Sequence, residues 1–236
     1  MSETKQPCNN EPELPILHTD GLIHYKFSGC NECEEKTANL IAEKFQVKKG
    51  EKNKCLFLDR DGTINVFNTG LNFKREQIKL IAGIDELIKK FIDNGYKIIV
   101  ITNQGGIGKG VYTENDLYCV NRLIDGLLRK NGARIDAVYY CPHYLGGNGE
   151  YNVKCECRKP GTLLLKKAIE HFNADLSRSI FIGDNVTDKL CAENSGVKFY
   201  PFEFRNVIKT QQGFRIVIKE YTQNLIEKIF RYANVK

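Results

Sequence analysis

From Cys55 onward, short apolar runs alternate with segments in which apolar residues recur every three or four positions. The runs CLFLD, YKIIVIT, IDAVYY and SIFIG have the length and composition of buried strands, and helical periodicity falls at residues 83–95, 114–130 and 162–172. Apolar strands that alternate with helices form a parallel sheet covered by helices on both faces. The sequence therefore predicts an α/β, Rossmann-like fold.

The first 53 residues lack this alternation. They are polar, and we expect residues 1–53 to be an N-terminal extension of unknown role, with a short helix within residues 37–47. Residues 54–236 are then the catalytic domain, and residues 214–235 predict a short strand followed by a closing helix.

Charge and hydropathy exclude several classes of protein. The 35 basic and 29 acidic residues are mixed along the chain, so we expect no nucleic-acid partner, and a small anionic substrate explains the net charge of +6. No apolar run approaches the ~20 residues that span a bilayer, and the N-terminus lacks the pattern of a secretory signal. These features predict a cytoplasmic protein without a membrane partner, which we expect to be a monomer.

Two aspartates follow the first strand directly. In LFLDRDGTIN, Asp59 and Asp61 have the spacing at which one carboxyl group can act as nucleophile and the other as general acid and base. Asp-Gly is also a common turn signal, so this segment alone leaves both readings open.

A glycine-rich loop follows the second strand. In VITNQGGIGKG, Thr102 and Asn103 offer hydrogen-bond donors, and the glycines allow the backbone to approach a phosphate. A flexible connection between strand and helix would have a similar composition.

Charged residues mark two further positions. Arg158 and Lys159 immediately precede a helix, where a lysine can neutralise a transferring phosphoryl group, although such pairs are mostly solvated surface. Asp184 and Asp188 follow the strand SIFIG and can bind a hard cation such as magnesium, or cap and stabilise the start of a helix.

The loop between residues 141 and 157 has the composition of a metal site. Cys141, His143, Cys155 and Cys157 form a Cys3His set around a glycine-rich segment with little apolar material. Thiolates and an imidazole suit four-coordinate structural zinc, so we expect a zinc-binding loop insertion. Cys30 and one further cysteine, Cys33, form a lone Cys-x-x-Cys in the extension, which is a weak indication of a second metal site.

The four polar segments, in this order and all at strand ends, resemble the motifs of the haloacid dehalogenase superfamily of phosphohydrolases. The resemblance implies that Asp59 is phosphorylated and that Asp61 protonates the leaving alcohol and later activates water. It also implies that Mg2+ is bound by Asp59, the Asp61 carbonyl and Asp184, and that Thr102 and Lys159 hold the phosphoryl oxygens. The role of Asp188 stays open. The short spacing between the first two motifs leaves no room for a large cap domain.

DRDGTIN, TNQGGIGKG, CPH and CECRKP are similar to the branch that contains heptose-bisphosphate and histidinol-phosphate phosphatases. This resemblance implies that a sugar phosphate is the substrate, with removal of the 7-phosphate of D-glycero-D-manno-heptose 1,7-bisphosphate as the leading reaction. Histidinol-phosphate phosphatase, nucleic-acid 3′-phosphatase and a non-catalytic binding protein for a phosphate ligand are the alternatives. The residues implied in substrate binding are Asn103, Gln104, Gly105, Arg158 and Asn185. The segment VFNTGLNF after DRDGTIN departs from the heptose pattern, which leaves the choice of substrate open.

Overall fold

The computed structural model of the protein describes residues 16–17, 21–27, 29, 31–48, 50–67, 76, 78–202, 206–209, 215–218 and 221–234. Its centre is a seven-stranded sheet in the order β1-β2-β5-β4-β3-β6-β7, in which β1 is antiparallel to β2 and all other neighbours are parallel. The strands are β1 (Ile16–Leu17), β2 (Ile23–Tyr25), β3 (Cys55–Leu58), β4 (Lys97–Asn103), β5 (Ala137–Cys141), β6 (Ile180–Gly183) and β7 (Lys198–Pro201). The prediction of an α/β parallel sheet is confirmed.

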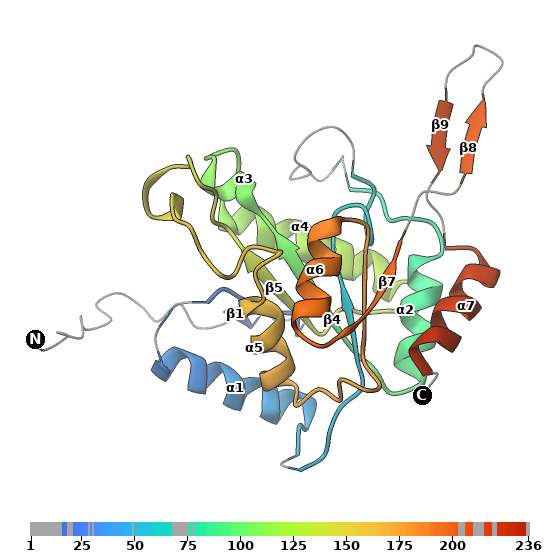
Figure 1. Cartoon of the computed structure of the whole chain (residues 1–236), viewed down its shortest axis with the longest axis horizontal. Helices are drawn as coiled ribbons and strands as arrows, with labels where there is room; N and C mark the ends of the chain where they lie inside the picture. Colours follow the sequence, from blue (N-terminus) through green and yellow to red (C-terminus); the bar gives the residue numbers. More distant parts are fainter. Residues whose placement is uncertain are drawn as a thin grey trace, which may run out of the picture.

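Helices cover both faces of the sheet (Figure 1). One face packs against α1 (Asn31–Phe45), α5 (Leu163–His171) and α6 (Val186–Asn194). The other face packs against α2 (Ile84–Asp93), α4 (Glu114–Arg129) and α7 (Gln223–Asn234). Two short elements, α3 (Gly105–Gly108) and the 3-10 helix η2 (Gly149–Tyr151), follow β4 and β5.

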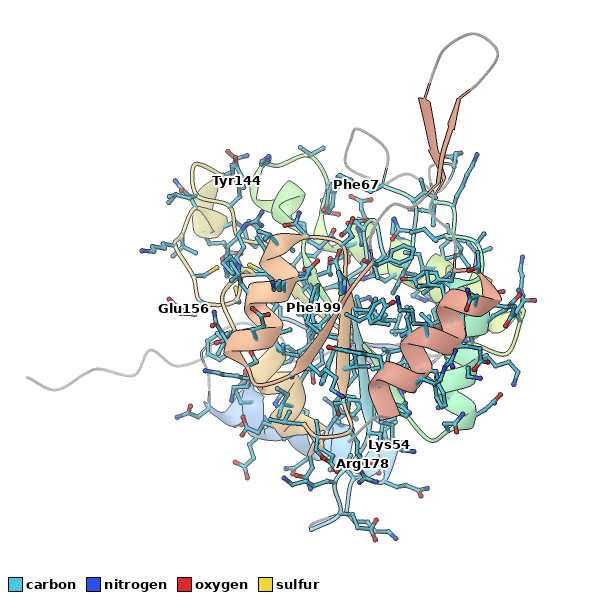
Figure 2. All side chains as sticks on the ribbon, turned by 45° about the vertical axis from the view of Figure 1, so that its right-hand side comes forward. Lys54, Phe67, Tyr144, Glu156, Arg178 and Phe199 are labelled. Atoms are coloured by element: carbon cyan, nitrogen blue, oxygen red, sulfur yellow. The ribbon has the colours of Figure 1, made fainter. Side chains whose placement is uncertain are left out.

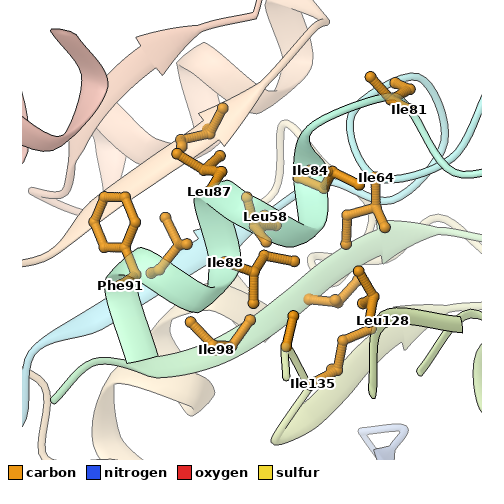
Figure 3. Packing of buried hydrophobic residues seen from close by; sticks show 14 of the residues in the cluster. Leu58, Ile64, Ile81, Ile84, Leu87, Ile88, Phe91, Ile98, Leu128 and Ile135 are labelled. Carbon is orange, nitrogen blue, oxygen red and sulfur yellow. The ribbon is translucent and has the colours of Figure 1, made fainter. Parts of the chain in front are cut away.

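The apolar pattern of the strands explains this three-layer arrangement. Side chains alternate across a strand, so Leu58 belongs to the core beneath α2 and α4, whereas Phe57 belongs to the core beneath α5 and α6. Figure 3 shows Leu87, Ile88 and Phe91 of α2 in the same buried cluster as Leu58. Full burial of one such side chain contributes roughly 1.5–3 kcal/mol, so both faces of the sheet require a covering layer.

Part of the N-terminal segment belongs to the same sheet. Strand β2 pairs with β5, and the Tyr25 hydroxyl donates hydrogen bonds of 2.8 and 2.7 Å to the two carboxylate oxygens of Glu34 in α1. A three-residue strand carries too little periodicity to be recognised in the sequence. The domain boundary at residue 54 stays a prediction, as does a metal site at Cys30, which lies outside the described residues, and Cys33, which is buried in α1.

The segments after β3 and β7 are small additions to the sheet. The described residues between Thr63 and Thr102 form α2 and β4, with no large cap domain among them. Strands β8 (Asn206–Lys209) and β9 (Arg215–Ile218) pair with each other and project away from the sheet (Figure 1), and α7 follows them. Strand β9 and α7 correspond to the predicted strand and closing helix. Within the described residues, no helix has the length and apolar character needed to cross a membrane.

Candidate active site

The predicted catalytic residues converge at one edge of the sheet. Figure 2 shows Phe67 and Tyr144 at one end of the molecule and Lys54 and Arg178 at the opposite end. Lys54 and Arg178 lie just before β3 and β6, so the end with Phe67 and Tyr144 is that of the strands' carboxyl termini. A cavity of about 430 Å³ opens there and contains Asp59. Ligands of such sheets bind at this edge.

A buried lysine bridges two of the aspartates. The ammonium nitrogen Nζ of Lys159 lies 2.6 Å from Oδ1 of Asp59 and 2.6 Å from Oδ1 of Asp188, and it donates to the carbonyl oxygen of Ile101 at 2.7 Å. Lys159 and Asp188 are 4% and 1% exposed, and Asp59 is 7% exposed at the cavity. The lysine is therefore held rigidly beside the predicted nucleophile.

Burial and charge act against each other at this pair. Burial raises the pKa of Asp59, Lys159 opposes the rise, and Asp188 adds to it. Burial alone would lower the pKa of Lys159, but the charges of Asp59 and Asp188 outweigh that effect and raise it. The lysine is thus a permanent cation in this site.

Asp61 is oriented by a residue that the motif analysis did not single out. Arg60 donates from Nη2 to Oδ2 of Asp61 at 2.7 Å and from Nε to Oδ1 at 3.3 Å, and Asn65 Nδ2 donates to Oδ1 at 2.9 Å. Burial alone would raise the pKa of Asp61, but the charge and hydrogen bonds of Arg60, with those of Asn65 and Gln104, lower it. The sign of this role is that Arg60, a charged residue within the motif, is only 2% exposed.

Gln104, which directly follows β4, supports the site from outside the cavity. The Gln104 amide nitrogen donates to Thr102 Oγ1 at 2.9 Å and to Asp61 Oδ2 at 3.1 Å, while its oxygen accepts from the Tyr112 hydroxyl at 2.6 Å. Gln104 is 1% exposed and does not line the cavity among the described residues. Its bond to Thr102 leaves the threonine hydroxyl proton available for a ligand.

The side chain of Asn103 holds the loop that carries the lysine. Asn103 Nδ2 donates to the backbone oxygen of Lys159 at 3.0 Å, and Asn103 Oδ1 accepts from the backbone nitrogen of Lys159 at 2.9 Å. The side chain also lines the cavity, as do Gly105, Arg158 and Asn185. Four of the five predicted substrate-binding residues therefore reach the cavity.

Three carboxylates form a set suited to a hard cation. Asp59, Asp184 and Asp188 each bring an oxygen within 4.8 Å of the others. Gly62 permits this approach, because its φ is +89° and a Cβ there would meet the Asp184 carboxylate. Asp188 also accepts a hydrogen bond of 3.0 Å from the Asn185 backbone nitrogen, which closes a capping box at the start of α6.

Two further cationic side chains line the cavity. Lys109 Nζ lies 4.1 Å from the ring centroid of Tyr144, and the Arg158 guanidinium carbon lies 5.8 Å from the same centroid. Arg158 also donates to the carbonyl oxygen of His143 at 3.3 Å. The Asn185 side-chain oxygen accepts from the Thr187 backbone nitrogen at 3.1 Å, so its amide nitrogen is the group that it can present to a ligand.

The predicted Cys3His set is assembled. Cys157 Sγ lies 3.0 Å from Cys141 Sγ, 3.2 Å from Cys155 Sγ and 3.1 Å from His143 Nδ1. A tetrahedron with ~2.3 Å bonds to sulfur places sulfur atoms roughly 3.8 Å apart, so the four ligand atoms already converge on a common centre. The hydrogen bond from Cys157 lowers the pKa of Cys141 to about 6, which favours the thiolate that a metal binds. The cluster could therefore hold a metal ion.

A larger cavity, of about 990 Å³, lies on the other side of Tyr112. His24, Lys26, Glu114 and Tyr118 are among its lining residues, but none of the predicted catalytic acids is. Size therefore does not identify the reaction site, and we assign the phosphate chemistry to the smaller cavity.

An open α/β sheet with a pair of aspartates after its central strand, a lysine beside the first of them and further acids after the neighbouring strand defines a haloacid dehalogenase-like phosphatase. A family model described as polynucleotide kinase 3 phosphatase matches residues 54–204, and the chain belongs to this phosphatase family. It is an enzyme, which sets aside the alternative of a non-catalytic binding protein.

Within this family, the chain is similar to heptose-1,7-bisphosphate 7-phosphatases. The chain is 39% identical over 146 residues to the D-glycero-beta-D-manno-heptose-1,7-bisphosphate 7-phosphatase of Haemophilus ducreyi, a match that covers 61% of this chain and 80% of the relative. It is 40% identical over 149 residues to the D-glycero-alpha-D-manno-heptose-1,7-bisphosphate 7-phosphatase of Campylobacter jejuni, covering 62% of this chain and 80% of that one.

Solved structures share the fold. A protein from Mesorhizobium loti, described as a HAD-like phosphatase, is 26% identical with a TM-score of 0.66, and the match covers 79% of this chain and 90% of that one. The D,D-heptose 1,7-bisphosphate phosphatase from B. bronchiseptica, complexed with magnesium and phosphate, is 24% identical with a TM-score of 0.57, covering 63% of this chain and 79% of that one.

Proposed function

We propose that this phosphatase removes the 7-phosphate of a D-glycero-D-manno-heptose 1,7-bisphosphate through a phosphorylated Asp59. The observation that carries the proposal is the cavity itself. It is lined by Asp59, which lies beside a buried lysine, and also by Lys109 and Arg158, which lie around Tyr144. A substrate with a second phosphate group fits these additional cations.

The first step is an attack by a carboxylate oxygen of Asp59 on the 7-phosphorus. The bond from phosphorus to the C7 oxygen breaks, and the leaving oxygen takes a proton from Asp61. Lys159 and the hydroxyl of Thr102 bind the equatorial phosphoryl oxygens, where charge accumulates. In the free enzyme Asp61 is ionised; an arriving phosphate dianion raises its proton affinity, and Asp61 takes up a proton from solvent before it acts as the acid.

The second step returns the enzyme to its starting state. Asp61, now a carboxylate, removes a proton from water, and the water oxygen attacks the phosphorus of the acyl phosphate. The bond between phosphorus and the Asp59 oxygen breaks, so inorganic phosphate leaves and the Asp59 carboxylate is restored, and Asp61 then releases its proton to solvent. Arg60 keeps the same Asp61 oxygens in place during both steps.

Two metal ions complete the proposal. Asp59, Asp184 and the Asp61 carbonyl would hold Mg2+, which supplies Lewis-acid polarisation of the phosphate, and Asp188 would orient Lys159. Cys141 and the other three members of the Cys3His set would hold a structural Zn2+ that orders a loop with few apolar residues. The backbone oxygen of His143 accepts a hydrogen bond from Arg158, so ordering of the metal loop also holds this arginine in the cavity.

The charges of Lys109 and Arg158 favour the heptose substrate over histidinol phosphate. A cationic substrate needs a nearby acidic contact. Among the described lining residues, the acids are Asp59, Asp61, Asp184 and Asp188, and all four belong to the proposed reaction centre. The two curated relatives act, by their names, on opposite anomers, so both anomers are candidate substrates.

A nucleic-acid 3′-phosphatase is the second candidate, because the matching family description names that activity. Against it, the basic residues are dispersed, with a net charge of only +6 over 236 residues. The monomeric state and cytoplasmic location stay predictions.

The test is phosphate release with and without Mg2+ from both anomers of the heptose bisphosphate, histidinol phosphate and a 3′-phosphorylated oligonucleotide. We expect the highest kcat/KM for a heptose bisphosphate and no release by Asp59→Asn. Lys109→Ala should raise KM for the bisphosphate about tenfold and leave KM for a monophosphate unchanged.

A preference for histidinol phosphate or the oligonucleotide would refute the heptose substrate but leave the aspartyl-phosphate chemistry intact. Release by Asp59→Asn at the wild-type rate would refute the chemistry itself. An equal rise in KM for the bisphosphate and the monophosphate in Lys109→Ala would contradict the assignment of Lys109 to binding of the second phosphate.

A further inference from the structure

A chain of buried polar side chains runs from the N-terminal strand β2 to Asp61. His24 of β2 lies with its ring nitrogen Nε2 3.0 Å from Nδ2 of Asn121 in α4. Asn121 Oδ1 accepts from Arg60 Nη1 at 3.0 Å, and Arg60 binds Asp61 through two further nitrogens. His24, Asn121 and Arg60 are each 2% exposed or less.

The direction of each hydrogen bond in this chain is determined. Arginine can only donate, so the oxygen of the Asn121 amide must face Arg60 and its nitrogen must face His24. His24 Nε2 is consequently the acceptor, which requires a neutral ring with its proton on Nδ1. One acceptor on β2 therefore fixes the orientation of the amide, and the amide fixes Arg60.

We infer that His24 is a positioning residue for the reaction, and that through Asn121 and Arg60 it holds the Asp61 carboxyl group in the orientation for proton transfer. This inference rests on the proposed role of Asp61 as acid and base. It gives the N-terminal segment a function, since β2 lies outside the region, residues 54–204, that the phosphatase family model matches.

Geometry supports a role in orientation more than in packing alone. The guanidinium also donates to Gln104 Oε1 at 3.1 Å, so three acceptors on different elements determine its plane. Without the Asn121 contact, Arg60 keeps its charge but loses one of these anchors. Residues that orient the ligands of a metal site typically change metal affinity or activity by 10- to 100-fold when removed, and we expect the lower end of this range for a residue that orients Asp61 through two others.

The experiment compares two phosphate esters with different needs for a general acid. An alkyl phosphate such as glycerol 2-phosphate needs its leaving oxygen protonated, whereas p-nitrophenol leaves readily as an anion. His24→Phe keeps the aromatic ring that lies 4.7 Å from the Tyr118 ring but removes the acceptor. We expect kcat/KM, which reports formation of the phosphoenzyme, to fall about tenfold for the alkyl phosphate and less than about threefold for p-nitrophenyl phosphate.

Three variants serve as comparisons. His24→Gln keeps a side-chain acceptor and should recover kcat/KM for the alkyl phosphate to within about threefold of wild type. Lys26→Met removes a different link from this segment to α4, the 3.0 Å ion pair with Glu114, and should leave the ratio of the two kcat/KM values unchanged. Asn121→Ala breaks the chain at its middle, and should lower the same kcat/KM as His24→Phe without further loss in the double variant.

The results separate this inference from the proposed chemistry. Asp61→Asn should lower kcat/KM for the alkyl phosphate selectively, and its failure to do so would refute the role of Asp61 as the acid. If Asp61→Asn is selective but His24→Phe and Asn121→Ala lower kcat/KM equally for both substrates, or Lys26→Met has the same selective effect, the positioning role of His24 is overturned. If His24→Phe loses the helical circular dichroism of the wild type, Asn121→Ala decides between the two outcomes.

Discussion

Replacing Lys159 by methionine should destabilise the protein strongly. Its ammonium nitrogen lies 2.6 Å from an oxygen of Asp59 and 2.6 Å from an oxygen of Asp188. With an effective dielectric constant of ~20, each pair has a gross attraction of roughly 6 kcal/mol, much of which offsets the desolvation of three buried charges. Removing the cation leaves two buried carboxylates uncompensated, so we expect Lys159→Met to lower the free energy of unfolding by about 3–5 kcal/mol.

The measurement is urea unfolding at pH 8 without added Mg2+, followed by far-ultraviolet circular dichroism because the chain contains no tryptophan. Lys166→Met is the matched control, since Lys166 is exposed on α5, and it should change stability by less than about 0.5 kcal/mol. The double variant Lys159→Met with Asp188→Asn should recover part of the loss. A loss below about 1 kcal/mol, or no recovery in the double variant, would refute the reasoning from buried charge.

Two further predictions concern the metal sites. Gly62→Ala should raise the Mg2+ concentration for half-activation about tenfold, because a Cβ at φ +89° displaces Asp184. The control Gly126→Ala, in the middle of α4, should leave activation unchanged and stabilise the protein by up to ~1 kcal/mol. Equal activation curves for the two variants would contradict the prediction. Cys155→Ser should lower the metal content per chain, measured by mass spectrometry, and lower the Tm by about 2–4 °C for each kcal/mol of metal-binding free energy lost, whereas the exposed Cys119→Ser should change neither. A wild-type metal content in Cys155→Ser would exclude the cysteine as a ligand.

The sequence was sufficient for the residues that meet at the sheet edge. Asp59 and Asp184 lie just after a buried strand and Thr102 lies at the end of one, and the carboxyl ends of parallel strands share one edge whatever the details of packing. The Cys3His set was predictable for a related reason, because a glycine-rich loop with paired ligands has few other means of becoming ordered.

Side-chain direction was not predictable in the same way. Gln104 directly follows the strand that contains Thr102, but its side chain does not line the cavity and is bound instead by Asp61 and Tyr112. The contact between His24 and Asn121 joins residues 97 positions apart and depends on a three-residue strand that has no periodicity of its own. Such contacts follow from the register of β2 on β5, which the local pattern does not specify.

The charges of the site explain why the reaction should require a divalent cation. Asp59, Asp184 and Asp188 supply three carboxylates against the single ammonium of Lys159, while the charge of Asp61 is balanced by its partner Arg60. Without a metal, a phosphate dianion would approach two uncompensated negative charges, and a divalent cation cancels both. Substrate binding should therefore depend on a metal already in place, whereas folding of the sheet, which rests on its two apolar layers, should not.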